Sequence, residues 1–149
     1  MYQDYLELLQ CLNDNKVKYL VIGGYAVIQY AEPRYTKDID IWVEASVVNA
    51  KKLLKALKTF GAPIANLSVE ELSIPGLVYV FGIPPVRVDI LNRVSGGKFE
   101  LAWKVKNVVA LEGIKVNFVS QSDLIKMKKA TGRPQDLADI ASLQKKKKR

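Results

Sequence analysis

The strongest structural signal in this sequence lies in two neighbouring segments, VIGGYAV at residues 21–27 and RYTKDIDI at residues 34–41. The first predicts a strand over 17–22 that runs directly into Gly23 and Gly24 and then into a short helix over 25–30. Because glycine lacks a Cβ atom, the backbone can approach a phosphate at this turn, where the helix N-terminus presents free N–H groups. A glycine pair at a tight turn also serves purely structural needs, so an anion site is one of two interpretations.

Two aspartates follow at the start of the next predicted strand. Residues 38–43 alternate between polar and apolar and then become fully apolar, which places Asp38 and Asp40 on one strand face. Their Cα atoms should lie about 6.5–7 Å apart, so their carboxylates could share one Mg²⁺ or two ions. Two such carboxylates repel each other, and a cation relieves the repulsion. The alternative is an exposed sheet face with two solvated aspartates.

A third carboxylate, Asp89, stands among apolar residues in a predicted strand over 86–91. Arg87 shares its face, so one interpretation is an Arg87–Asp89 ion pair on the strand surface. The functional interpretation places Asp89 beside Asp38 and Asp40 on a neighbouring strand, where it could ligate a metal and accept a proton from an attacking hydroxyl.

The composition excludes several classes of catalysis. The 149 residues include one cysteine, Cys11, and no histidine, which rules out Ser-His-Asp or Cys-His catalysis and zinc sites with histidine ligands. The lone cysteine, the absence of a signal peptide and the absence of a long apolar run predict a cytoplasmic protein without membrane contact. Of the net charge of +8, residues 145–149 supply +5. We expect one domain over 1–144 and a disordered basic tail over 145–149, with binding of a phosphate backbone as the alternative for the tail.

The remaining pattern predicts an α/β (α+β) domain, with a mixed β-sheet core flanked by helices and two C-terminal helices. Ser46 is the expected N-cap of a helix to residue 60. Residues 120–123, from Ser120 to Asp123, fit a capping box that starts a helix through residue 130, and Gly132 is the expected C-terminal cap of that helix. Asp136 and Asp139 fall in the first turns of the last helix, where they favour the helix dipole. The buried stripe of the helix 46–60 is predicted to be Val47, Ala50, Leu54 and Leu57. Further helices are expected over 2–12, 99–104 and 134–143, and further strands over 77–81, 107–111 and 115–119.

The order of these motifs resembles the nucleotidyltransferase superfamily of DNA polymerase β-type enzymes. Its elements are Gly-Gly, thirteen intervening residues, Asp-x-Asp at the start of a strand, and a later strand aspartate. Two segments are similar to a small bacterial branch of this superfamily. The first combines residues 23–27 with the pattern Arg34-x-Thr36-x-Asp38-x-Asp40, and the second is the C-terminal segment from Asp123 to Asp139. That branch holds AbiEii-type toxins, minimal nucleotidyltransferases, and lincosamide or aminoglycoside nucleotidyltransferases. The resemblance runs from about residue 6 to residue 143.

The resemblance implies Mg²⁺-dependent transfer of a nucleotidyl group from an NTP, ATP among them, to a hydroxyl, with release of pyrophosphate. Gly23 and Gly24 would hold the triphosphate. Asp38, Asp40 and Asp89 would bind two Mg²⁺ ions, and Asp89 would activate the acceptor hydroxyl.

The same resemblance implies four further nucleotide contacts. Lys129 and Arg133 match a Lys-x-x-x-Lys/Arg pattern near the triphosphate, and Arg34 and Thr36 precede the aspartate pair. Arg34 could instead support its loop, and Thr36 could serve as a hydrogen-bonding residue of that loop.

The acceptor and the partners stay open at this point. RNA, a protein hydroxyl and a small hydroxylated molecule such as an antibiotic are all candidates, and a toxin-like role would bring an antitoxin or a homo-oligomer. Rival interpretations are a catalytically inactive nucleotide- or partner-binding protein and an RNA-binding module that uses the tail. A haloacid-dehalogenase-type phosphatase would not explain the glycine pair, and a dinucleotide-binding fold would need a Gly-x-Gly-x-x-Gly motif, which is absent.

Overall fold

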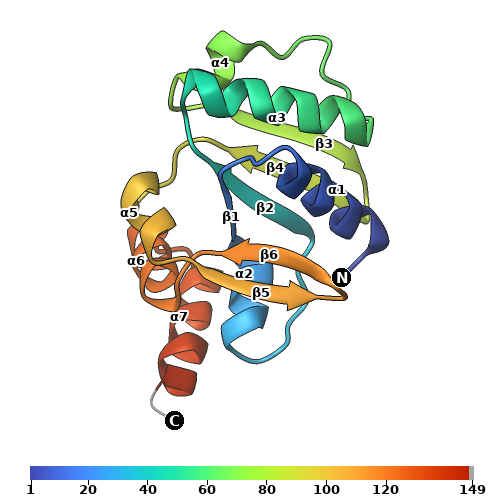
Figure 1. The fold of residues 1–149 in the computed structure, drawn as a ribbon. Coiled ribbons are helices and arrows are strands. Elements are labelled where there is room, and N and C mark those ends of the chain that lie inside the picture. The colour runs from blue at the N-terminus through green and yellow to red at the C-terminus, as the bar shows by residue number, and fades with distance from the viewer. Residues whose placement is uncertain (148–149) are drawn as a thin grey trace.

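A six-stranded mixed sheet forms the centre of the protein, with the strand order β3-β4-β2-β1-β6-β5. The structure, a computed structural model, describes residues 1–147 and is shown in Figure 1. The strands are β1 (Tyr19–Ile22), β2 (Asp38–Val43), β3 (Val78–Ile83), β4 (Val86–Leu91), β5 (Asn107–Leu111) and β6 (Ile114–Phe118). The helices are α1 (Gln3–Asp14), α2 (Gly23–Tyr30), α3 (Val47–Phe60), α4 (Val69–Ser73), α5 (Phe99–Lys104), α6 (Gln121–Thr131) and α7 (Pro134–Lys147). The predicted α/β class with a mixed sheet is confirmed.

The pairing of β2 with its two neighbours places the predicted site residues together. β2 runs parallel to β4, with Asp40 opposite Asp89, and antiparallel to β1, with Asp40 also opposite Ile22. Since α2 begins directly after Ile22, the glycine turn lies beside Asp40. The outer pairs β3–β4 and β5–β6 are antiparallel hairpins, and β6 runs parallel to β1.

The two faces of β2 have different environments. Ile39 and Ile41 are fully buried in the hydrophobic core, whereas Asp38 and Asp40 on the other face are only partly buried. α1 and α3 pack against each other, and α2 contacts α6 and α7 at the lower end of the molecule in Figure 1. The face of β2 that carries Asp38 and Asp40 therefore lies next to α6 and α7, which contain the C-terminal segment from Asp123 to Asp139.

Three predicted helix ends are confirmed by their capping contacts. The side chain of Ser46 accepts a hydrogen bond from the backbone N–H of Asn49, and that of Ser120 accepts one from the N–H of Asp123. Gly132 adopts the left-handed conformation with φ of 59°, and its N–H donates to Lys128 O at 2.9 Å. These ends depend on contacts within one turn of helix, which is why short sequence patterns predict them.

Some expectations were wrong. Val47 is 51% exposed and does not belong to the buried stripe of α3, because that helix turns Asn49 inward, where it bonds to both Lys18 N and Lys18 O. α4 was not predicted at all. α7 ends at Lys147 and not at the predicted residue 143, and residues 148 and 149 of the predicted tail lie outside the described residues, so disorder of the tail stays a prediction. No helix among the described residues has the length and apolarity needed to cross a membrane.

Candidate active site

The three predicted carboxylates lie on two adjacent strands. Asp40 on β2 and Asp89 on β4 are direct register partners, which places their Cα atoms about 4.8 Å apart. Asp38 lies two residues before Asp40 on the same strand face. The parallel pairing of β2 and β4 therefore brings together residues that stand 49 positions apart in the chain.

The glycine pair is required by close packing at this site. A Cβ atom added to Gly23 would lie 2.2 Å from Asp40 Oδ2, and the φ of Gly23 is +69°. A Cβ atom on Gly24 would lie 2.2 Å from Thr36 Oγ1. Neither position has room for a side chain, so the glycines allow the start of α2 to sit against β2 and the loop before it.

An open pocket of about 590 Å³ joins the carboxylates to the C-terminal helices. Its walls come from the end of β1 and the start of α2, from β2, from β4 and the segment after it, and from α6, α7 and the turn between them. The lining residues are Ile22, Gly23, Asp40, Asp89, Leu91, Arg93, Val94, Ser95, Leu124, Met127, Lys128, Ala130, Thr131, Arg133 and Asp136. Acidic groups therefore face basic groups across one cavity.

The carboxyl of Asp40 has a raised pKa of about 7. Burial is the largest cause, and the negative charges of Asp89 and Asp38 add to it. The positive charges of Lys128 and Arg133 act in the opposite direction and do not cancel the effect. Burial first, and the two neighbouring carboxylates second, therefore disfavour the ionised form of Asp40.

Arg87 pairs with two of the three carboxylates. Its Nε lies 3.0 Å from Asp89 Oδ1 and 3.7 Å from Asp38 Oδ2. The hydrogen bond to Asp89 and the negative charge of that residue raise the pKa of Arg87. The ion pair considered from the sequence is therefore present, and it coexists with the placement of Asp89 beside Asp40.

The chemistry of these donors suits Mg²⁺, which prefers carboxylate oxygens. A divalent cation would also relieve the repulsion that Asp89 and Asp38 exert on Asp40. As the side chains stand, no three Asp, Glu, Cys or His residues in the described part of the chain are arranged so that they could hold a metal ion. Asp38 and Asp89 would have to turn from Arg87 toward a common ion, so the metal site stays a prediction.

Asp136 is the centre of a buried network on the other side of the pocket. Its side chain is 0% exposed, and it accepts hydrogen bonds from Lys128 Nζ at 3.2 Å, Thr131 Oγ1 at 2.6 Å and Arg133 Nε at 2.8 Å. Burial by itself would raise the pKa of Asp136, but the hydrogen bonds from Arg133, Thr131 and Lys128 outweigh it and hold the pKa well below its usual range.

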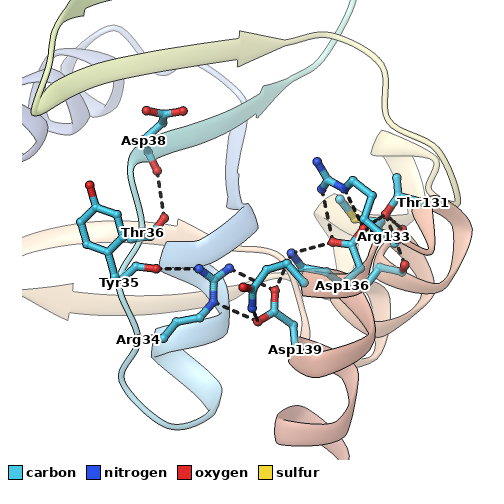
Figure 2. A network of polar contacts seen from close by, with 11 residues as sticks. Arg34, Tyr35, Thr36, Asp38, Thr131, Arg133, Asp136 and Asp139 are labelled. Atoms are coloured by element: carbon cyan, nitrogen blue, oxygen red, sulfur yellow. Dashed lines mark hydrogen bonds and ion pairs between the residues drawn. The ribbon is translucent and has the colours of Figure 1, made fainter.

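A second buried carboxylate, Asp139, ties α7 to the loop before β2. Figure 2 shows Arg34 reaching from that loop toward Asp139. Arg34 Nε lies 2.9 Å from Asp139 Oδ1, and Lys128 Nζ lies 2.9 Å from Asp139 Oδ2. The expectation that Asp136 and Asp139 act mainly on the helix dipole was wrong, because both are buried acceptors for cations from other elements.

The structure separates the predicted nucleotide contacts into two groups. Gly23 and Arg133 line the pocket. Gly24 is buried against Thr36, which donates to Asp38 O at 3.3 Å, and Arg34 donates to Tyr35 O at 2.7 Å (Figure 2). Arg34 and Thr36 thus support their loop, in line with the alternative that the sequence had left open for each.

Lys129 is exposed and does not line the pocket, whereas its neighbour Lys128 is buried and does. Sequence reasoning assigned the contact to Lys129 in preference to Lys128, and it missed Arg93 and Ser95, which follow β4. The helical spacing of Leu124, Met127 and Lys128 on one face of α6 was the available signal for the lysine.

Comparison with known proteins agrees with this fold. A family described as "Nucleotidyltransferase of unknown function (DUF6036)" matches residues 3–146. A crystal structure of the lincosamide antibiotic adenylyltransferase LnuA with bound lincomycin is similar over 97% of this chain and 96% of that one, with 17% identity and a TM-score of 0.59. An antigenic nucleotidyltransferase-like protein from Paracoccidioides brasiliensis is similar over 96% of this chain and 77% of its own, with 17% identity and a TM-score of 0.55.

At such low identity the two structures show a shared fold. No curated protein sequence matches this chain significantly. The family match covers nearly the whole chain. The chain therefore belongs to this family of nucleotidyltransferases of unknown function.

Proposed function

We propose that this protein transfers a nucleotidyl group from a nucleoside triphosphate to a hydroxyl acceptor and releases pyrophosphate, with Mg²⁺ as its cofactor. The observation that carries the proposal is the single pocket in which Asp40 and Asp89 face Lys128 and Arg133. A triphosphate is a polyanion, so it needs both a basic wall and a cation at the acidic wall.

Each residue has a role in this reaction that depends on its position in the pocket. Asp38, Asp40 and Asp89 would hold Mg²⁺, which when bound would neutralise phosphate charge and stabilise the leaving pyrophosphate. Asp89 accepts the proton of the acceptor hydroxyl. Arg133, whose side chain is 71% exposed, is free to bind a phosphate while Asp136 holds its position. The protein thus contributes orientation and charge neutralisation.

The start of α2 offers a further contact for a phosphate. No side chain caps the N-terminus of this helix, so its first N–H groups are available to an anion. Gly23 lines the pocket at this point, and the absence of a Cβ atom there keeps the approach open.

The acceptor class is the least determined part of the proposal. The sequence leaves RNA, a protein hydroxyl and a small hydroxylated molecule as candidates, and the similar structure of LnuA was solved with an antibiotic bound. A cytoplasmic location, where NTPs and Mg²⁺ are abundant, is part of the proposal.

Calorimetric titration with each NTP in the presence of Mg²⁺ tests the proposal. We expect binding to the wild-type protein that requires Mg²⁺ and is lost in Asp38→Ala and Asp40→Asn, while the matched variant Asp4→Asn, at an exposed position of α1, binds as the wild type does. Labelled NTP then reveals the acceptor as RNA, protein or small molecule. Folded protein that binds no NTP, or binds equally without Mg²⁺, would overturn the proposal and favour an inactive partner-binding protein.

A further inference from the structure

A second pocket, of about 810 Å³, lies at the opposite end of β1 from the carboxylates. Its walls come from the end of α1, the segment that leads into β1, α3, α5 and the β5–β6 hairpin. The lining residues are Gln10, Asn13, Lys16, Val17, Lys18, Lys52, Trp103, Val108, Gly113, Lys115 and Asn117. Val17 and Lys18 precede β1 and line this pocket, whereas Ile22 at its other end lines the first, so the two cavities are separate.

The lining carries four lysines and no acidic residue. Lys18 lies 3.6 Å from Glu44 Oε2, a distance at which the two charges attract. Lys16, Lys52 and Lys115 take part in none of the ion pairs formed within the described residues. Like charges gathered without partners raise the local positive potential and attract anions.

Two lysine ammonium groups lie over the indole ring of Trp103. Lys106 Nζ lies 3.9 Å from its ring centroid and Lys18 Nζ lies 5.9 Å from it. Phe99 stacks on the same ring, with the two ring centroids 5.9 Å apart, so the indole is fixed in place beside these two lysines. The pocket therefore attracts negative charge.

The floor of the pocket is held in place by uncharged polar groups. Asn13 Nδ2 donates to Lys115 O at 2.6 Å, and Tyr19 OH donates to Asn13 Oδ1 at 2.9 Å. These bonds tie the end of α1 to the hairpin, so the lysine side chains project from a rigid base.

The backbone of Lys16 has an uncommon conformation. Its φ is 55°, in the left-handed region that glycine and asparagine adopt at lower cost. Replacing Lys16 by glycine would therefore remove the charge without straining the backbone.

From these observations we propose that the lysine pocket binds the phosphodiester backbone of a single-stranded nucleic acid. Lysine is a compact point charge on a flexible stem, which suits successive phosphates better than the fixed geometry of one small ligand. A recess between secondary-structure elements admits a flexible strand more readily than a rigid duplex. The proposal does not depend on nucleotidyl transfer, because no carboxylate of the first pocket takes part.

Fluorescence anisotropy with 5′-labelled U20 RNA tests the proposal on the full chain. We expect Lys52→Glu/Lys115→Glu to weaken binding roughly tenfold or more, and the slope of log K against log salt to fall by about 0.7 for each lost phosphate contact. The matched variant Lys55→Glu/Lys126→Glu, at exposed positions outside both pockets, should bind nearly as the wild type does. Asp40→Asn should also leave RNA binding intact, which separates this proposal from the proposed function.

Lys16→Gly distinguishes binding from a structural role, since it should weaken RNA binding while the melting temperature stays the same or rises. Labelled dT20 and a hairpin duplex are the comparison ligands: dT20 should bind much as U20 does, and the duplex more weakly. Equal binding by Lys52→Glu/Lys115→Glu and the wild type would overturn the proposal. So would full loss of binding when residues 145–149 are replaced by serine, because the basic tail would then be the binding element.

Discussion

Replacing Asp136 by alanine should destabilise the fold strongly, because the change leaves buried cationic groups without their acceptor. The carboxylate is 0% exposed and accepts hydrogen bonds from Lys128, Thr131 and Arg133. Removing one partner of a buried ion pair costs about 3–5 kcal/mol in general. Lys128 keeps Asp139 at 2.9 Å, and Arg133 is 71% exposed and can be hydrated, so we expect the lower end, about 3 kcal/mol.

Urea unfolding followed by circular dichroism at pH 7.5 measures this loss. Asp4→Ala serves as the control, since Asp4 is exposed in the first turn of α1 and its removal should cost about 0.5 kcal/mol or less. A loss below about 1 kcal/mol in Asp136→Ala would refute the assigned role, because that value is typical of an ordinary surface hydrogen bond.

The difference in free energy of unfolding between the wild type and Asp136→Ala should also depend on pH, which gives a second readout. The folded-state pKa of Asp136 lies below its usual 3.8, so the folded state favours the ionised form. The stabilisation is therefore fully present above the unfolded-state pKa and is lost as pH falls through the acid range. The gap in stability between wild type and Asp136→Ala should be constant above about pH 5 and should narrow below pH 4.

Three other predictions concern the glycine turn, Asp40 and Arg87. Gly24→Ala should cost about 1–3 kcal/mol in urea unfolding, because its Cβ atom would lie 2.2 Å from Thr36 Oγ1; a neutral effect would mean that the loop yields freely. The raised pKa of Asp40, about 7, means that without Mg²⁺ the folded state holds the proton of this carboxyl more tightly than the unfolded state does, so stability is lost as pH rises from about 4 to about 7. Asp40→Asn should thus melt at a higher temperature than the wild type at pH 8 and near the same temperature at pH 4, and equal melting at pH 8 would contradict the assigned burial. Arg87→Gln should tighten Mg²⁺ binding in calorimetry, because Arg87 competes for Asp89 and Asp38; weaker binding would show that Arg87 supports the metal site instead.

Local patterns were enough to locate most elements of this protein. The alternation over residues 38–43 predicted β2, and Ser46, Ser120 and Gly132 marked helix ends correctly, since each depends on neighbours within one turn. Both aspartates of β2 could be placed on one strand face for the same reason, because alternation is a property of a single strand.

The candidate site was predictable only as a set of residue types. The grouping of Asp38, Asp40 and Asp89 was one of two interpretations of the pattern, and the family resemblance favoured it. The register that sets Asp40 opposite Asp89 depends on the pairing of β2 with β4. Sequence cannot fix that register, since a shift by two residues would keep the same faces buried.

Tertiary structure alone decided which charged groups are buried and with what partners. Arg34 meets Asp139 across 105 positions of sequence, and Lys128, not Lys129, faces the pocket because packing sets the rotation of α6. Packing also explains why Val47 lies outside the core, since the hydrogen bonds of Asn49 to the backbone of Lys18 set the rotation of α3. The chain itself specifies strands, caps and acidic motifs through local contacts, whereas ion-pair partners and pockets arise only when distant segments are packed together.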